Sequence, residues 1–363
     1  MIYIQAILTL AVIGTGLTVL LLVLAYFFAR YGTCKVKVND REPFEVEGGG
    51  KLLDALYDNK IFIPSACGGQ GTCGFCKTRV LSGGGPLLPT ETPYLTEEEQ
   101  QCGTRLACQV KIRNDIEIQV KPEFLNIKQF VATVDEATMK TGDIREIHFK
   151  LQPGDAIEFH PGQYVQVLVP SKKETIFRAY SIASVPADQD SIELLVRLIP
   201  KGLGSTYLHA IQPGDQVTFT GPYGEFILDQ DPEAELVCVG GGVGMAPMRS
   251  LLRHIAQANP QKKAWLFFGA RTTDQLLYLE EFTKLQKELP NFKICYALSE
   301  PEKCPDWNGE TGFIHLAVEK LLEKNDNPKR QAFLCGPPQM LEAARNTLTQ
   351  KGFQDCNIFA DEF

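Results

Sequence analysis

Four cysteines with a fixed spacing place the strongest constraint on this chain. Cys67, Cys73 and Cys76 follow the pattern C-x5-C-x2-C, and Cys108 comes after 31 intervening residues. The glycines between the first three let the loop fold tightly, so that thiolates can converge on one inorganic core while backbone N–H groups point at its sulfurs. A structural zinc more often uses two C-x2-C pairs, and this region holds one. The pattern favours a [2Fe–2S] cluster over zinc or unrelated buried thiols, and it therefore indicates one-electron transfer.

Length and charge narrow the remaining possibilities. The chain has 363 residues, enough for two or three domains with their own cores. Its net charge of −8 argues against a nucleic-acid partner, which would require a basic face. Eleven cysteines in a chain of this length are more typical of reduced thiols and cluster ligands than of a disulfide framework.

The N-terminal stretch from Met1 to Ala29 has no charged residue and is rich in Leu, Val, Ile and Phe. About 26 such residues make roughly 39 Å of helix, which is enough to cross a bilayer. Arg30, Lys35 and Lys37 follow at once, so the positive-inside rule places the C-terminal body in the cytoplasm. A cleaved signal peptide is the alternative, but the stretch lacks a basic start and its apolar run is long.

Three soluble segments follow this predicted membrane anchor. The first shows alternating strands at 34–38 and 44–46, a helical pattern at 51–56, and two further predicted strands at 110–112 and 116–120. These describe a small mixed sheet packed on one helix. The acidic run Glu97–Glu99 is either a solvated helix start or a docking face for a partner.

The second and third segments have different rhythms. From about Lys128 to Asp229, short alternating strands such as 163–169 and 192–197 are separated by Pro-Gly turns, which suggests an antiparallel barrel. From Glu235 onward, predicted strands at 236–239, 265–268, 293–297 and 332–334 alternate with helices at 248–256 and 276–286. This βαβ rhythm predicts a parallel sheet with helices on both faces.

A glycine-rich loop follows the first strand of the third segment. Gly240-Gly241-Gly242-Val243-Gly244 leads to Met245-Ala246-Pro247, and Pro247 suits a first helical turn because no N–H is needed there. Glycines let a backbone approach a diphosphate, and the helix N-terminus offers free N–H groups to its charge. Tight packing without a ligand is the alternative, but the strand–loop–helix context favours a nucleotide.

A second set of residues lies in the barrel segment. In Arg178-Ala179-Tyr180-Ser181, the arginine can pair with a phosphate, the ring can lie on a flavin, and the hydroxyl can reach its reactive nitrogen. By itself, this run also fits an exposed strand with a surface arginine. The turn Gly202-Leu203-Gly204-Ser205-Thr206, which opens a helix, adds another candidate anion site.

Five motifs then occur in one order along the chain: Arg-x-Tyr-Ser, Gly-x-x-Ser-Thr, Gly-Pro-Tyr-Gly from Gly221, the loop from Gly241 to Pro247, and Cys-Gly-Pro from Cys335. This order resembles the ferredoxin–NADP reductase superfamily with an N-terminal ferredoxin domain. Together with the N-terminal helix, Arg105-Leu106-Ala107-Cys108-Gln109 and Met245-Ala246-Pro247-Met248-Arg249-Ser250, it resembles the F subunits of sodium-pumping NADH:quinone oxidoreductases over essentially the whole chain.

The resemblance implies a four-part organisation. It consists of a transmembrane anchor over 1–30, a β-grasp [2Fe–2S] ferredoxin-like domain over 33–125, an antiparallel FAD-binding β-barrel domain over 128–230, and an α/β parallel-sheet NADH-binding domain over 231–363. It also implies a single-pass protein of the bacterial inner membrane. Its partners would be integral membrane subunits of a respiratory complex, NADH, and quinone as the final acceptor.

The resemblance also assigns roles to residues. Arg178 would bind the flavin phosphate, Tyr180 would stack on the ring and Ser181 would contact its reactive nitrogen, with Gly204, Ser205 and Thr206 holding the FAD diphosphate. The loop residues Gly241, Gly242, Gly244 and Pro247, together with Gly336, would bind NADH, with Cys335 beside the nicotinamide. Phe363 would cover the flavin face, with Asp361 and Glu362 nearby. Cys67, Cys73, Cys76 and Cys108 would hold the cluster, although Cys102 could compete with Cys108.

Two further expectations concern the reaction. Glu300 and Pro301 follow the strand at 293–297 where a basic side chain would grip a 2′-phosphate, so NADH is preferred to NADPH. A hydride from NADH would reach FAD, and single electrons would then reach the cluster. There are two competing interpretations: a reductase that serves an oxygenase, and an electron-carrier or assembly subunit with a vestigial flavin domain. The predicted anchor argues against the first and the retained flavin motif against the second.

Overall fold

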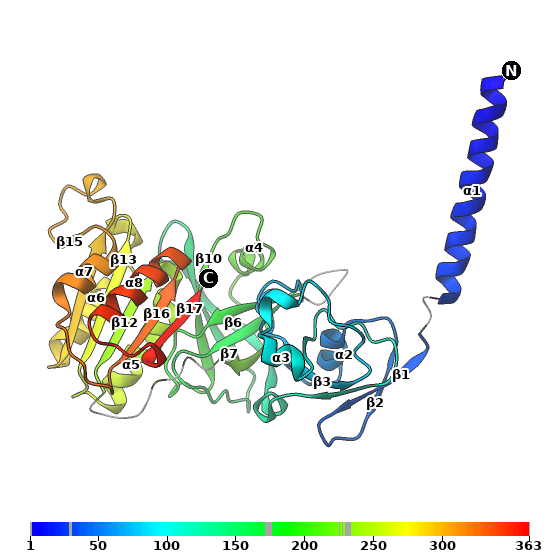
Figure 1. The fold of residues 1–363 in the computed structure, drawn as a ribbon. Helices are drawn as coiled ribbons and strands as arrows, with labels where there is room; N and C mark the ends of the chain where they lie inside the picture. The colour runs from blue at the N-terminus through cyan, green and yellow to red at the C-terminus, as the bar shows by residue number, and fades with distance from the viewer. Residues whose placement is uncertain are drawn as a thin grey trace. The chain divides into compact units, whose positions relative to one another are not determined.

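The computed structural model describes residues 2–28, 31–170, 176–224, 226, 228 and 234–362 (Figure 1). The chain forms two compact units, one over Met1–Ile127 and one over Lys128–Phe363. Each unit has its own sheets and cores, and each is described by itself.

A single long helix opens the first unit. Helix α1 spans Ile2–Phe28. Its stretch Tyr3–Leu24 has a mean hydropathy of 2.6, and none of its residues is buried against the rest of the chain. By length and composition this helix can cross a membrane, because 22 residues at 1.5 Å each exceed the roughly 30 Å hydrocarbon core.

A five-stranded mixed sheet forms the rest of the first unit. Its strand order is β2-β1-β5-β3-β4, with β1 parallel to β5 and the other pairs antiparallel. Helix α2 packs Leu52, Leu53 and Leu56 into the core of this sheet. The bounds are β1 Thr33–Val38, β2 Phe44–Glu47, α2 Leu52–Asp58, β3 Lys77–Ser82, α3 Glu97–Gln101, β4 Thr104–Leu106 and β5 Ile116–Gln119.

One predicted strand of this unit is wrong. The alternation at Val110 and Ile112 does bury both side chains, but the segment forms only an isolated bridge between Lys51 and Lys111. The backbone is instead fixed at single points, such as Leu52 N–H to Val110 O at 2.9 Å. The sequence also missed β3 and β4. Burial in β3 follows no clean alternation, so a period-2 pattern is absent there.

The second unit begins with a six-stranded antiparallel sheet in the order β10-β7-β6-β11-β8-β9. An isolated bridge from Ile182 to Leu194 brings the two outer strands together and closes the sheet into a barrel. The bounds are β6 Lys128–Met139, β7 Ile144–Leu151, β8 Tyr164–Val169, β9 Ile176–Ser181, β10 Ser191–Arg197, α4 Leu203–Ala210 and β11 Gln216–Tyr223.

A six-stranded parallel sheet completes the second unit, in the order β15-β14-β13-β12-β16-β17. Helices α5 and α6 share one core with the sheet, and α7 and α8 share another, so the sheet is covered on both faces as predicted (Figure 1). The bounds are β12 Leu236–Gly241, α5 Met245–Ala258, β13 Ala264–Ala270, α6 Leu279–Glu288, β14 Phe292–Leu298, β15 Glu310–Thr311, α7 Ile314–Leu321, β16 Gln331–Gly336, α8 Pro338–Gln350 and β17 Ile358–Glu362.

Charged side chains join the barrel to the parallel sheet. Arg249 of α5 is buried, forms an ion pair with Glu193 of β10, and also bonds to Glu281 of α6 at 3.0 Å. Its guanidinium lies 4.3 Å from the ring centroid of Tyr278. Ser250 adds a hydrogen bond to the carbonyl of Ser184 at 2.6 Å. The two halves of this unit are therefore held together by directional contacts.

Candidate functional site

The four cysteines of the spaced pattern come together as two pairs. The sulfurs of Cys67 and Cys73 lie 3.4 Å apart, and Cys73 donates its hydrogen to Cys67. This hydrogen bond lowers the pKa of the Cys67 thiol to about 4 and raises that of Cys73. Cys76 donates to Cys108 in the same way, which lowers the pKa of Cys108 to about 7.

Backbone conformation explains why glycines surround these thiols. Gly68, Gly69, Gly71 and Gly74 have φ values of 66°, 81°, 74° and 72°, in the left-handed region that residues with a β-carbon rarely adopt. The loop therefore curls back on itself and presents the thiols of 67, 73 and 76 toward Cys108. Two thiol pairs fit a centre of two irons with two thiolates each.

Cys108 and Cys102 differ in their surroundings. Cys108 is buried, and a buried ion pair fixes the strand before it: Arg105 donates to the Glu91 carboxylate from Nε at 3.0 Å, and Glu91 also accepts the Leu106 N–H at 2.9 Å. Cys102 is exposed at the end of α3. Cys108 as the fourth ligand stays a prediction, and its burial beside Cys76 fits that role better than the exposed position of Cys102.

The flavin-side residues converge on the start of α4. Arg178 and Tyr180 lie on β9, and a Cβ placed on Gly204 would come within 2.7 Å of Arg178 Cγ and 3.0 Å of the Tyr180 hydroxyl. Gly204 therefore leaves the space in which these two side chains meet the first turn of the helix. The first N–H groups of a helix lack intrahelical partners, so a cation and free donors gather here.

The hydroxyl groups near the start of α4 differ in exposure and in hydrogen bonding. Ser205 is buried, and its Oγ accepts the Ile199 N–H at 3.0 Å, so it also stabilises the turn before α4. Thr206 is exposed, and its N–H bonds to Gly202 O. Ser181 ends β9 opposite Tyr164 and is half-buried. Burial raises the pKa of Tyr180 to about 12, so its phenol stays protonated at neutral pH.

The glycines of the loop after β12 let other parts of the chain pack closely against this loop. A Cβ on Gly244 would lie 2.0 Å from the carbonyl oxygen of Cys335, and one on Gly241 would lie 3.0 Å from Met340 Sδ. Gly242 has a φ of 56° and leads into α5, where Pro247 is the third residue. The loop and the end of β16 therefore lie against each other, which brings Cys335 and Gly336 to the predicted nucleotide loop.

The C-terminal strand places two acidic residues beside the end of β16. In β17, Asp361 pairs in register with Cys335 and Glu362 with Gly336. Burial raises the pKa of the Cys335 thiol, and Asp361 raises it further, so this thiol is protonated at neutral pH. Phe363 lies outside the described residues, and its role over the flavin stays a prediction.

Arg197 is a candidate binding residue that the sequence analysis missed. Its Nη2 would lie only 2.0 Å from a Cβ on Gly242, so the guanidinium at the end of β10 lies directly against the nucleotide loop. Asp143 contacts its Nε at 3.3 Å. The run Val-Arg-Leu carries no motif that would single out this arginine. Only the packing of the barrel on the sheet places its charge there.

A cluster of charged groups also escaped the sequence analysis. Burial alone would raise the pKa of Glu146, but hydrogen bonds from His148, Lys140 and Tyr278 hold it at about 2. Glu193 lies 3.7 Å from His148 Nδ1, and Arg249 joins the same group. Because Arg249 and Lys140 already neutralise these carboxylates, the cluster is best explained as a structural contact between β7, β10 and α5.

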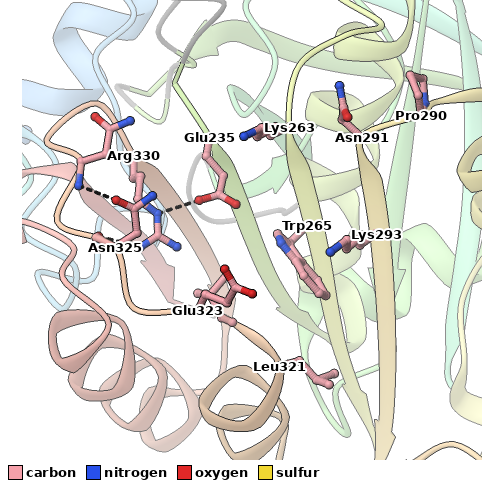
Figure 2. Close-up of a pocket in the computed structure, with 12 residues that line it drawn as sticks. Glu235, Lys263, Trp265, Pro290, Asn291, Lys293, Leu321, Glu323, Asn325 and Arg330 are labelled. Carbon is pink, nitrogen blue, oxygen red and sulfur yellow. Dashed lines mark hydrogen bonds and ion pairs between the residues drawn. The ribbon is translucent and has the colours of Figure 1, made fainter.

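A separate pocket lies at the end of the parallel sheet opposite to the glycine loop that follows β12 (Figure 2). It opens where β12, β13 and β14 begin, whereas the nucleotide loop follows the end of β12. Arg330 bonds to Glu235 at 2.7 Å, and Lys293 lies over the Trp265 ring. None of the residues that line this pocket is among the predicted cofactor residues. Its lining includes Glu235, Lys263, Trp265, Pro290, Asn291, Lys293, Leu321, Glu323, Asn325 and Arg330.

Three family models match successive parts of the chain. The family model of a 2Fe-2S iron-sulfur cluster binding domain matches residues 38–113, that of an oxidoreductase FAD-binding domain matches 131–227, and that of an oxidoreductase NAD-binding domain matches 238–346. The expected cofactors, [2Fe–2S], FAD and NADH, are thereby confirmed, and so is the predicted fold class. The zinc alternative is not supported.

Curated relatives are similar over nearly the whole chain. The F subunit of the Na(+)-translocating NADH-quinone reductase of Neisseria meningitidis is 37% identical over 391 aligned positions, which cover 95% of this chain and 96% of the relative. The chain belongs to this family of F subunits. The corresponding protein of Pseudomonas aeruginosa is 35% identical, with 96% and 95% of the two chains covered. As a member of the family of F subunits, the chain is an NADH-dependent oxidoreductase that carries FAD and [2Fe–2S] domains.

Solved structures are similar to this chain over most of its length. A cytochrome P450 reductase of Amycolatopsis is 30% identical with a TM-score of 0.72, and 91% of this chain and 99% of that chain are covered. A ferredoxin reductase in carbazole 1,9a-dioxygenase is 25% identical with a TM-score of 0.69 and similar coverage. This member of the F subunits therefore shares its fold over most of its length with these two reductases.

Proposed function

We propose that this chain takes a hydride from NADH onto FAD, passes single electrons to its [2Fe–2S] cluster, and delivers them to integral membrane subunits and finally to quinone, with coupling to sodium transport. The observation that carries this proposal is the presence in one chain of a thiolate loop, a flavin-side cation at a helix start, a nucleotide loop and a membrane-length helix. Bound FAD and NADH supply the hydride chemistry, and FAD can release the electron pair one electron at a time.

The residues of the second unit would bind and orient these groups. Arg178 and the start of α4 supply positive charge and N–H donors for the FAD diphosphate. Tyr180 offers a neutral ring, because its pKa of about 12 keeps the phenol protonated. The glycine loop that leads into α5 would bind the NADH diphosphate, and Cys335 presents a protonated thiol next to this loop. Hydride transfer requires no general base from the protein.

The membrane part of the proposal depends on α1 and its flanking charges. We propose that the chain lies in the bacterial inner membrane with its soluble body in the cytoplasm, because Arg30, Lys35 and Lys37 follow the apolar helix. A predominantly apolar helix stretch of 22 residues would hold the ferredoxin-like unit near the bilayer surface, where membrane subunits accept its electrons. Soluble oxygenase reductases need no such helix. That difference separates the proposal from its main alternative.

The electron order is tested by removing the cluster. In Cys73→Ala, NADH should still bleach the flavin under anaerobic conditions, while the visible absorbance of the cluster is lost. Cys102→Ala is the matched control and should keep its iron. A flavin that stays oxidised in Cys73→Ala with ample NADH would show that the proposed order is wrong.

The acceptor is tested in the membrane. Purification of the chain from membranes should bring integral subunits with it, and quinone reduction by NADH should rise when sodium is added. If the chain purifies alone and instead reduces an oxygenase component, the alternative function holds.

A further inference from the structure

The side chain of Gln109 lies beside the sulfur of the fourth cysteine. Its Nε2 donates a hydrogen bond to Cys108 Sγ over 3.6 Å, and its Oε1 accepts one from Thr90 Oγ1 at 3.1 Å. The Thr90 hydroxyl thus occupies the oxygen side of the amide, which turns the NH₂ group toward sulfur. Two segments far apart in sequence, at 90 and 109, therefore fix one donor on one sulfur.

The cluster loop leaves room for this amide. A Cβ on Gly71 would come within 2.5 Å of Gln109 Nε2 and 2.9 Å of its Cδ, so a larger residue would displace the side chain. Gly71 also donates its backbone N–H to Cys108. The sulfur of Cys108 therefore receives one donor from the loop backbone and one from a side chain.

The two thiol pairs differ in access to water. Cys67 and Cys73 are partly exposed, whereas Cys76 and Cys108 are buried. Charge at the buried pair can be stabilised only by protein donors. Gln109 supplies such a donor where solvent does not.

We propose that Gln109 is a positioning residue that raises the reduction potential of the cluster by donating a hydrogen bond to Cys108. Reduction adds one electron, and hence one negative charge, to the cluster and its thiolates. A donor aimed at a thiolate stabilises this charge more in the reduced state than in the oxidised state, and hydrogen bonds to the sulfurs are one of the factors that set cluster potentials. This inference rests on the proposed role of Cys108 as a ligand, but not on quinone or sodium.

The test measures the potential of the cluster in the purified full-length chain. Gln109→Leu removes the donor at similar size, and the midpoint potential should become more negative while the iron content stays at the wild-type level. Gln109→Glu adds a negative charge in place of the donor and should shift the potential further in the same direction. Thr90→Val frees the Gln109 amide to rotate and should give a smaller negative shift of the midpoint potential.

Gln100→Leu is the matched control. Gln100 donates to Leu95 O at 3.0 Å in the same unit, and its replacement should leave the potential unchanged.

The outcomes separate the possible failures. An unchanged potential in fully loaded Gln109→Leu would overturn the proposal. If that variant loses its iron, Thr90→Val decides, because it alters neither a ligand nor the residue next to one; an unchanged potential there would also overturn the proposal. If Cys108→Ala keeps its iron while Cys102→Ala loses it, the ligand assignment itself is wrong, and the inference about Gln109 falls with it.

Discussion

Two glycine-rich loops lie at the candidate cluster and nucleotide sites, and they differ in the main reason for which they need glycine. In the cluster loop, Gly68, Gly69, Gly71 and Gly74 all have φ between 66° and 81°. In the nucleotide loop, Gly242 shares this region with a φ of 56°, but Gly241 and Gly244 have ordinary φ values of −148° and −60°. Gly244 is instead required because another backbone passes within the space that a Cβ would fill.

Glycine can thus be required for two reasons: because the backbone has a left-handed φ, or because another atom occupies the place of a Cβ. A conformational demand is met in part by asparagine, which tolerates the left-handed region better than other residues with a β-carbon. A demand on space next to backbone is met by no larger residue, because the neighbouring backbone cannot rotate away. The two loops should therefore respond differently to the same set of substitutions.

The largest effect is expected for Gly244→Ala. The added methyl would lie 2.0 Å from the Cys335 carbonyl oxygen and 2.6 Å from its carbon, so β16 and the loop must separate. Overpacking of this kind costs about 3 kcal/mol or more at the site. The apparent KM for NADH should rise about a hundredfold or more, since each 1.4 kcal/mol is about a factor of ten. Steady-state kinetics with an artificial electron acceptor give this value.

The Gly244 position also tests the comparison between the two loops, because FAD binding and the cluster should be unaffected there. FAD content and cluster absorbance should remain at wild-type levels, because the barrel and the first unit do not contain the contact. Gly244→Asn should be at least as damaging as Gly244→Ala. A milder effect of asparagine would indicate that conformation, not space, governs this loop.

A smaller effect is expected for Gly204→Ala, where the neighbours are side chains. The methyl would approach Arg178 Cγ at 2.7 Å and the Tyr180 hydroxyl at 3.0 Å, and both groups can shift. We expect a cost of about 1–2 kcal/mol, so the affinity for FAD should fall about tenfold. Equilibrium titration of the apoprotein with FAD measures it. A loss equal to that of Arg178→Ala would contradict this estimate, because it would mean that Arg178 cannot shift and is displaced from the site.

Local pattern was enough to predict the two classes of sheet. The strand at 236–239 and its glycine loop are contiguous in sequence, and the Pro-Gly turns at 153–154 and 213–214 set φ at Gly154 and Gly214 to 93° and 95°, as in type II turns. Alternation placed β8 and β10 correctly for the same reason. Each of these features depends on neighbouring residues along the chain.

Features that depend on distant pairs could not be predicted. The ion pair of Arg105 with Glu91 is buried, but an arginine and a glutamate 14 residues apart carry no signal of pairing. Arg197 and Gln109 gain their places only when strands and loops far apart in sequence pack together. The predicted strand at 110–112 failed for the opposite reason. Burial of alternate side chains was correct, but no continuous partner strand lies beside it.

A purely conformational effect is expected at Gly69. Its φ is 81°, and a Cβ there would meet no atom closer than 3.6 Å, which is ordinary contact. Gly69→Ala should therefore cost about 1–2 kcal/mol through backbone strain alone. Iron retention during dialysis against a chelator should fall in this variant and recover in part in Gly69→Asn. Equal loss in both variants would show that the loop excludes a Cβ for reasons other than φ.

The smallest effect is expected at Gly50, where neither demand applies. This glycine precedes α2, its φ lies outside the left-handed region, and a Cβ would meet nothing within 4 Å. Gly50→Ala should narrow the unfolded ensemble without straining the fold, which stabilises the first unit by about 0.4–1 kcal/mol. The temperature at which cluster absorbance is lost should therefore rise slightly. A clear fall instead would mean that glycine at this position serves a requirement other than φ or local space, and the two-way division between the loops would then be incomplete.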